Sequence, residues 1–182
     1  MPDDPWIIRT AEPEDAPGIA LVHVESWRTT YAGIFPESVL NALSVEKRAS
    51  FWRDTLAAPE RSSAALVACS RDGKVVGFVS GGKERSGELG CDGELYAIYL
   101  FREAQRTGLG TRLVRGLVRQ LEERGFTSMA VWVLELNPAK KFYEALGGEA
   151  IGRKSLEQQG QSFEEIAYGW SSLRRFREGW KG

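Results

Sequence analysis

One continuous segment, residues 94–125, combines a strand pattern, a glycine-containing turn and the pattern of an amphipathic helix. Its beginning, residues 94–100, is rich in aromatic and branched side chains, which favour a half-buried strand. Gly125 stands where a helix commonly ends in a left-handed residue. The segment therefore predicts a strand that passes through a tight turn into a helix. The apolar residues that follow one face of this helix are Leu113, Val114, Leu117, Val118 and Leu121.

The turn has the sequence Gln-Arg-Thr-Gly-Leu-Gly at residues 105–110. Its two glycines let the backbone approach a ligand closely, and the first N–H groups of the following helix have no intrahelical partner. Because the helix dipole also favours negative charge there, the turn predicts a site for a phosphate or pyrophosphate. A Walker A motif is excluded because Thr111 and Arg112 follow the second glycine, and a dinucleotide fingerprint is excluded by Leu113.

This turn resembles the acetyl-coenzyme A site of the GNAT N-acetyltransferases, whose signature Gln/Arg-x-x-Gly-x-Gly/Ala is matched at Gln105, Gly108 and Gly110. Residues 137–148 are similar to a second family motif, in which an Asn follows a strand and a Tyr precedes Leu-Gly. The resemblance implies an α/β, single-domain GNAT-like fold with a mixed, mostly antiparallel central sheet flanked by helices. It also implies N-acetyltransferase activity with acetyl-coenzyme A as co-substrate.

The whole chain predicts the order β-α-α-β-β-β-α-β-α-β-β, which agrees with that fold from end to end. Asp72-Gly73 is a hairpin signal, and a second turn is expected at residues 158–160. The expected strands cover residues 6–10, 64–70, 75–82, 94–100, 128–134, 149–157 and 161–170. The expected helices run from residue 12 towards Tyr31, over 45–56 with Ser44 as cap and Pro59 beyond, over 111–125, and from Asn137 and Pro138 to Gly147.

We expect one N-acetyltransferase domain over residues 1–170 and a tail over residues 171–182. Leu173, Phe176 and Trp180 fall at roughly helical spacing in this tail, to which no role is assigned.

The composition of the chain argues against three classes of binding partner: nucleic acid, membranes and metal ions. A formal net charge of −1 gives no general basic surface, so a main role in binding nucleic acid is not expected. No apolar run approaches the roughly 20 residues of a membrane span, and the first residues do not resemble a signal sequence, so we expect no membrane partner and a cytoplasmic location. Cys69 and Cys91 lack metal-ligand spacing, and His23 is the only histidine, so no metal is expected.

Acetyl transfer to an amine requires a proton acceptor, a stabilised oxyanion and a proton donor for the departing thiolate. The resemblance assigns the donor to Tyr143, since a phenol with a pKa of roughly 10 is protonated at neutral pH. It assigns the acceptor to Glu94, although a solvated residue at a strand end is an equally good interpretation. For Tyr143 the alternative is an aromatic side chain on the core face of its helix, and the match to the family motif favours the proton donor. Four other carboxylates stay open as the acceptor: Glu25, Glu84, Glu88 and Asp92.

The resemblance places the cofactor along the strand, the turn and the second motif. Backbone groups near residues 98–100 would hold pantetheine and polarise the thioester carbonyl, and Arg106 is the arginine most directly part of the turn. The expected cofactor contacts are Ile98, Tyr99, Leu100, Gln105, Arg106, Thr107, Gly108, Leu109, Gly110, Thr111, Asn137 and Phe142.

The acceptor amine, on a small molecule or a protein, would contact Trp27 and Tyr31, which also have the spacing of a hydrophobic core pair. Direct attack in a ternary complex is favoured over a Cys91 nucleophile, because no histidine lies near Cys91 in sequence. A non-catalytic acyl-coenzyme A sensor and an acyl group longer than acetyl stay open as alternatives. The resemblance also leaves a homodimer open, since homodimerisation is a habit of the family.

Overall fold

The computed structural model describes residues 4–58, 63–158 and 160–178, which form two compact units. Unit 1 contains Met1–Ser80 and Ala97–Leu117, and unit 2 contains Gly81–Tyr96 and Val118–Gly182. Three positions named above, Pro59, Gln159 and Trp180, lie outside the described residues.

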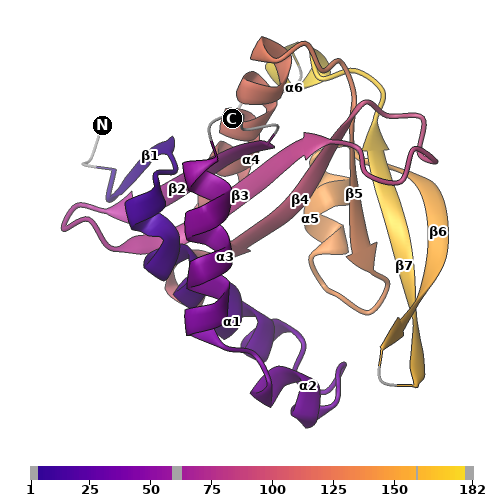
Figure 1. Ribbon diagram of the computed structural model, residues 1–182. Helices are drawn as coiled ribbons and strands as arrows, with labels where there is room; N and C mark the ends of the chain where they lie inside the picture. The colour runs from indigo at the N-terminus through magenta and orange to yellow at the C-terminus, as the bar shows by residue number, and fades with distance from the viewer. Residues whose placement is uncertain (1–3, 59–62, 159, 179–182) are drawn as a thin grey trace. The chain divides into compact units, whose positions relative to one another are not determined.

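The strands are hydrogen-bonded in the order β1-β2-β3-β4-β5-β7-β6 (Figure 1). β4 pairs with β5 in parallel, whereas β1 with β2, β5 with β7 and β6 with β7 are antiparallel. The predicted mixed, mostly antiparallel sheet is therefore confirmed. The strands are β1 (Trp6–Thr10), β2 (Ser63–Ser70), β3 (Val75–Lys83), β4 (Gly93–Leu100), β5 (Met129–Leu134), β6 (Glu149–Gln158) and β7 (Gln161–Trp170).

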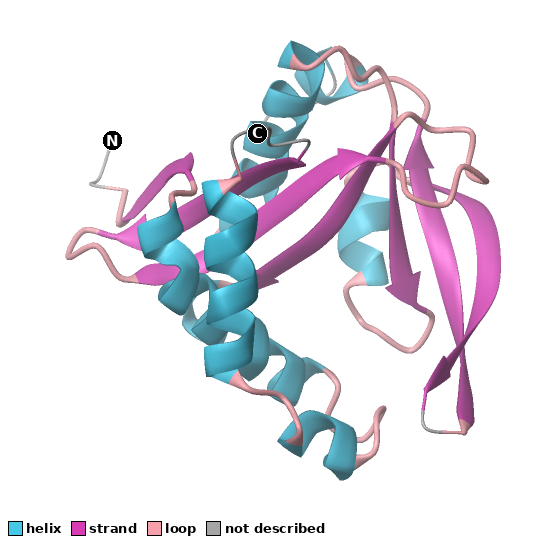
Figure 2. Ribbon diagram, viewed as in Figure 1, coloured by secondary structure: helices cyan, strands magenta, loops and turns pink. Residues whose placement is uncertain are grey.

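The predicted helices are present, and several short ones join them (Figure 2). Ser44 caps its helix as expected, because its Oγ accepts a hydrogen bond from the Lys47 backbone N at 3.2 Å. A further short helix, which was not predicted, follows Pro36 and buries Val39 and Leu40. The residues before it are typical of a loop, so the sequence pattern did not indicate this helix. The α-helices are α1 (Ala16–Thr30), α2 (Glu37–Asn41), α3 (Val45–Ala57), α4 (Leu109–Glu123), α5 (Lys140–Ala145) and α6 (Arg175–Glu178), with 3-10 turns η1 (Pro13–Asp15) and η2 (Arg102–Ala104).

The start of α5 differs from the prediction. The helix begins at Lys140, and the Asn137 side chain closes the turn before it, because Oδ1 accepts a hydrogen bond from the Ala139 backbone N at 2.9 Å. Asn137 is therefore not the N-cap of this helix. At the other end, Gly147 has a φ of 77°, which confirms the predicted left-handed stop.

In unit 1, helices cover both faces of β2 and β3. One face packs against α1 and α3, and its core includes Ile19, Trp52, Val67 and Phe78. The helix α4 packs against the opposite face. The contact is close, since a Cβ placed on Gly116 would come within 2.9 Å of Leu66 Cδ2. Figure 1 shows α1 and α3 in front of these strands and α4 behind them.

In unit 2, α5 packs against β7 through aromatic rings. The Tyr143 ring centroid lies 6.3 Å from that of Tyr168 and 6.5 Å from that of Trp170. The chain after β7 adds to this packing, since the Phe176 ring lies 5.5 Å from that of Trp170 and Leu173 is buried. The tail residues Leu173 and Phe176 therefore belong to the core of unit 2.

Candidate active site

The glycine turn of unit 1 has the backbone that an anion site requires. Arg106 has a φ of 59° and Gly108 a φ of 81°, so two left-handed residues stand just before α4. The Arg112 backbone N donates to the Gly108 carbonyl at 3.2 Å, which closes the first turn of the helix. The N–H groups of residues 109–111 precede this bond, and they are among the helix donors that lack an intrahelical acceptor.

Side chains of the turn brace its backbone. Gln105 Nε2 donates to the Leu100 carbonyl at 3.0 Å, and Thr107 Oγ1 donates to the Ala104 carbonyl at 2.8 Å. Leu109 is fully buried and anchors the start of α4. These contacts explain why the turn has this sequence, and they leave the exposed Arg106 as the cation of the turn itself.

Arg112, in the first turn of α4, is less available to a ligand than Arg106. Arg112 forms an ion pair with Asp4 in which Nη2 lies 2.6 Å from Oδ2, and its guanidinium also donates to the Trp6 carbonyl. The positive charge at Arg112 is therefore largely compensated within unit 1.

Trp27 and Tyr31 stand in a cluster of aromatic rings, also in unit 1. Their ring centroids are 4.7 Å apart, and Phe35 lies 5.8 Å from Trp27 and 5.3 Å from Tyr31. Trp27 Nε1 donates a hydrogen bond to the Tyr99 hydroxyl at 2.9 Å. Two residues expected to bind different substrates, Trp27 for the acceptor and Tyr99 for the cofactor, are therefore in direct contact.

His23 belongs to the same cluster and has an unusual environment. It is 8% exposed, and its ring stacks on those of Trp27 and Phe78 at 5.9 Å. Neither ring nitrogen has a hydrogen-bond partner. Burial, with a smaller contribution from the charge of Arg48, lowers the pKa of His23 to about 4, so the ring is neutral at pH 7.

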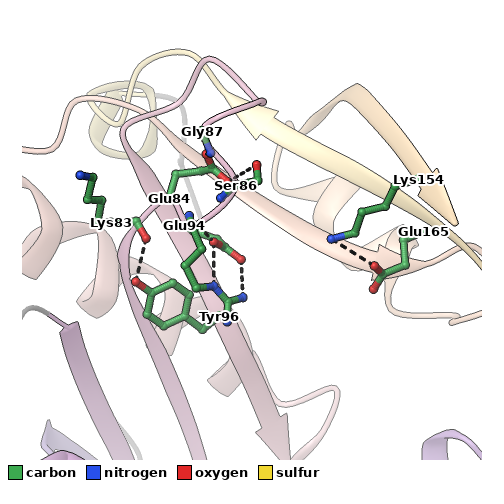
Figure 3. Close-up of polar contacts among 9 residues, drawn as sticks. Lys83, Glu84, Ser86, Gly87, Glu94, Tyr96, Lys154 and Glu165 are labelled. Carbon is green, nitrogen blue, oxygen red and sulfur yellow. Dashed lines mark hydrogen bonds and ion pairs between the residues drawn. The ribbon is translucent and has the colours of Figure 1, made fainter. Parts of the chain in front are cut away.

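Glu94, the expected proton acceptor, lies in unit 2 and is paired with Arg85 (Figure 3). Its side chain is 3% exposed, so it is not the solvated strand-end residue of the alternative interpretation. Arg85 Nη2 lies 2.5 Å from Oε1 and Nε lies 3.0 Å from Oε2, while the Arg85 backbone N also donates to Oε2. The Glu94 carboxylate raises the pKa of Arg85, which stays charged.

Arg85 is a site residue that was not predicted from the sequence. Its guanidinium stacks on the ring of Tyr96 at 4.4 Å, and the Tyr96 hydroxyl donates to the Lys83 carbonyl at 2.7 Å. The signal was weak, since Arg85 is one charged residue in a polar loop that precedes β4. Only the return of the loop past the strand brings Arg85 onto Glu94.

Two of the other candidate carboxylates are engaged in loop structure. Asp92 accepts hydrogen bonds from the backbone N and hydroxyl of both Thr127 and Ser128 at 2.7–2.9 Å. Burial alone would raise its pKa, but these bonds outweigh that effect and lower the pKa to about 2. Glu84 accepts from Ser86 and Gly87 in the same manner, and its pKa is lowered despite its burial. Both groups are poor proton acceptors at neutral pH.

Tyr143 is buried in unit 2, at 6% exposure, beside Phe142, Tyr168 and Trp170. The Tyr168 hydroxyl donates a hydrogen bond to Glu144 Oε1 at 2.6 Å. This bond, with burial as the second cause, raises the pKa of Tyr168 to about 12. The Tyr143 ring is therefore packed on one side by a tyrosine that remains protonated.

The strand register places Glu94 and Tyr143 on opposite faces of the sheet in unit 2. Glu94 pairs with Ala130, which pairs with Gly169, so these residues share a face. Tyr143 packs against Tyr168, which faces the other way because neighbouring residues alternate along a strand. Among the described residues, β4 and β5 pair only at Gly93–Met129 and Glu94–Ala130, so their parallel pairing ends at Glu94.

In the described ranges, 4–58, 63–158 and 160–178, no three or more His, Cys, Asp or Glu side chains are grouped to hold a metal ion. None of the helices in the described part of the chain has the length and apolar character needed to cross a membrane.

The chain is similar to known acetyltransferases over most of its length. The FR47-like protein family model matches residues 87–156. An uncharacterized N-acetyltransferase of Bacillus subtilis, YuaI, is 41% identical over 166 residues, which cover 91% of this chain and 93% of that protein.

Solved structures agree with the expected fold class. The PaiA N-acetyltransferase of Thermoplasma acidophilum, in complex with coenzyme A, has a TM-score of 0.64 at 22% identity and covers 88% of this chain and 97% of its own. YncA of Salmonella typhimurium, with its cofactor acetyl-coenzyme A, has a TM-score of 0.68 at 19% identity, with 93% and 95% covered. The predicted fold class is confirmed.

Proposed function

The chain belongs to the GNAT family of N-acetyltransferases, and from that membership we propose that it transfers the acetyl group of acetyl-coenzyme A to a primary amine. The acceptor is a small molecule or a protein, and the amine attacks the thioester directly in a ternary complex. Two structural neighbours solved with coenzyme A or acetyl-coenzyme A support this choice of co-substrate.

The observation that carries the proposal is the left-handed turn at Arg106 and Gly108 immediately before α4. It presents the backbone N–H groups of residues 109–111 and the positive end of the helix dipole to the same point. A pyrophosphate supplies the negative charge and the several acceptor oxygens that this arrangement favours. We assign pyrophosphate binding to residues 105–111, with Arg106 as the side-chain cation.

The remaining cofactor contacts are assigned along β4 and α5. The pairing of β4 with β5 ends at Glu94, which supports a role for backbone groups of Ile98, Tyr99 and Leu100 in holding pantetheine and the thioester carbonyl. Asn137 and Phe142 are assigned to the same arm of the cofactor. We propose that the transferred acyl group is acetyl and not a longer chain.

Tyr143 is assigned as the acid that protonates the departing thiolate. Its burial supports this role, because the aromatic neighbours hold the phenol ring in one position. The contact of Tyr168 with Glu144 fixes one of those neighbours.

Glu94 is assigned as the base that removes a proton from the acceptor amine, directly or through a water. Both of its oxygens contact Arg85, so one of these contacts must be exchanged for the amine or the water during turnover. The exposed position of Arg85 supports such an exchange, since its guanidinium can move into solvent. Trp27 and Tyr31 are assigned as binding residues for the acceptor, because their aromatic cluster would contact its apolar part.

The test is release of coenzyme A from acetyl-coenzyme A across a panel of polyamines, amino acids, aminoglycosides and peptides, with the Tyr143→Phe variant in parallel. Amine-dependent release that falls sharply in the variant is the expected result. Tight cofactor binding without release on any amine would instead favour a non-catalytic sensor of acyl-coenzyme A. Absence of cofactor binding would contradict the assignment of the turn.

A further inference from the structure

Lys154, Trp132 and Glu165 form a compact group on one face of the sheet in unit 2. Lys154 Nζ lies 4.1 Å from the centroid of the Trp132 ring and 3.4 Å from Glu165 Oε2. The three residues come from three neighbouring strands, β6, β5 and β7, and Lys154 is directly opposite Glu165 in the register. Figure 3 shows the Lys154 ammonium directed at the Glu165 carboxylate.

An aromatic face beside a carboxylate is the combination that recognises an alkylammonium group. The ring supplies a negative quadrupole and the carboxylate a compensating charge. Glu165 has a side-chain exposure of 16%, whereas the Lys154 side chain is 45% exposed. The Glu165 side chain is therefore more buried than the Lys154 side chain that contacts it. Lys154 can swing into solvent while Trp132 and Glu165, which we call the ammonium receptor, stay in place.

Small residues lie beside the Trp132 ring on the neighbouring strands. Trp132 pairs with Ala167, which in turn pairs with Gly152 on β6. A Cβ placed on Gly152 would lie 3.0 Å from Leu89 Cδ2, which is a tight contact, and 3.5 Å from Trp132 Cη2, which is ordinary van der Waals contact. The edge of the ring therefore reaches Gly152, and the face of the ring is the part that a cation contacts, as Lys154 Nζ does.

The ammonium receptor shares its face of the sheet with Glu94. Glu94 pairs with Ala130, and Trp132 stands two residues further along β5 with its side chain on the same side. One strand spacing and two residues along the strand separate Glu94 from Trp132 by roughly 8 Å between Cα atoms. An extended molecule with an amine at each end can reach both groups.

We propose that Trp132 and Glu165 bind the non-reacting ammonium of a diamine acceptor, and that Lys154 is the resident cation that this acceptor displaces. The proposal rests on the proposed function, because it takes Glu94 as the group beside the reacting amine. It narrows the acceptor to molecules with two primary alkylamines, and it gives Lys154 the role of excluding weaker cations.

Calorimetric titration with cadaverine in the absence of acetyl-coenzyme A tests the receptor by itself. Lys154→Gln removes the resident cation, and cadaverine should bind this variant about five-fold more tightly than the natural protein. The neutral pentane-1,5-diol should not bind, and adding Trp132→Leu or Glu165→Gln to Lys154→Gln should abolish the gain. Arg153→Gln is the matched control, since Arg153 neighbours Lys154 but lies on the opposite face in an ion pair with Glu135.

Equal cadaverine affinity in Lys154→Gln and Arg153→Gln would overturn the proposal. With acetyl-coenzyme A present, KM for cadaverine should be at least five-fold lower than KM for pentylamine, which has the same chain and one amine. Equal KM values would overturn the diamine assignment while leaving the transferase function intact. Failure to acetylate any amine would contradict the proposed function, whereas the calorimetric titration would still decide whether the receptor exists.

Discussion

Arg85 binds both carboxylate oxygens of Glu94, with Nη2 2.5 Å from Oε1 and Nε 3.0 Å from Oε2. The carboxylate is buried, at 3% side-chain exposure, whereas the guanidinium is 64% exposed. The charge of Glu94 is therefore neutralised by a partner that reaches in from solvent. This relationship makes the stability of unit 2 and the availability of Glu94 depend on the same arginine.

Arg85→Ala should lower the free energy of unfolding by about 1–3 kcal/mol, because it leaves a buried carboxylate without its charged donors. The exposure of Arg85 keeps the loss at the low end, since water replaces part of the contact. Arg153→Ala, which breaks the exposed pair with Glu135, should change the free energy of unfolding much less, because water replaces the contact at both groups. Urea unfolding of both variants measures the difference, and equal losses would contradict the structural role given to Arg85.

Tyr143→Phe should lower kcat by about 100-fold or more while leaving the affinity for acetyl-coenzyme A unchanged, because it removes only the proton donor. Tyr168→Phe is the matched control. It removes the hydroxyl that contacts Glu144 at 2.6 Å, and it should reduce stability by about 1 kcal/mol with little change in kcat. Steady-state kinetics and cofactor titration check both variants. A similar fall in kcat in the two variants would mean that packing, not proton donation, is what Tyr143 contributes.

The sequence predicted the elements whose signals are local. The strand, turn and helix over residues 94–125 were predicted from aromatic and branched residues, from glycines and from helical spacing. These signals need no distant partner, and all three elements are confirmed. The ends of α5 differ in this respect. Gly147 stops the helix as predicted, whereas Asn137 closes a turn before it. The role of Asn137 depends on a single side-chain contact, which the sequence pattern does not indicate.

The missed features depend on contacts between residues that are distant in the chain or on burial. Arg85 reaches Glu94 because a loop folds back along β4, and Lys154 reaches Trp132 because three strands pair in a particular register. The helix α2 forms because Val39 and Leu40 are buried, although Gly33 and Pro36 mark its surroundings as a loop. Pairing and burial of this kind cannot be derived from one sequence without the fold.

Gly108→Ala should weaken coenzyme A binding, because Gly108 has a φ of 81° in the turn that we assign to the pyrophosphate. No heavy atom lies within 4 Å of a Cβ placed there, so the cost is one of backbone conformation, about 1 kcal/mol. Gly147→Ala is the matched control, with a φ of 77° and equally open space. Both variants should lose similar stability in thermal unfolding. Cofactor titration should show a loss of affinity in Gly108→Ala alone, and an equal loss in both would contradict the assignment.

His23 should make the stability of the protein depend on pH between neutral and mildly acidic conditions. Its pKa falls from 6.5 in the unfolded chain to about 4 in the fold, mainly because burial disfavours the charged ring. Between these two pKa values the unfolded state binds more protons than the native state, so stability is complete above pH 6.5 and is lost as the pH falls. Linkage gives a loss of about 2 kcal/mol from this one group between pH 7 and pH 5.

His23→Leu should remove that contribution, because leucine has a similar volume and no proton to bind. At pH 7 the variant should also be as stable as the natural protein or more so, since both ring nitrogens of His23 are buried without a hydrogen-bond partner. Urea unfolding at pH 7, 6 and 5 measures the two slopes. Carboxylates elsewhere affect both proteins equally, so the difference between the slopes isolates His23. Parallel slopes would show that the ring is protonated or solvated in the native state, contrary to its position among Trp27, Phe78 and Tyr99.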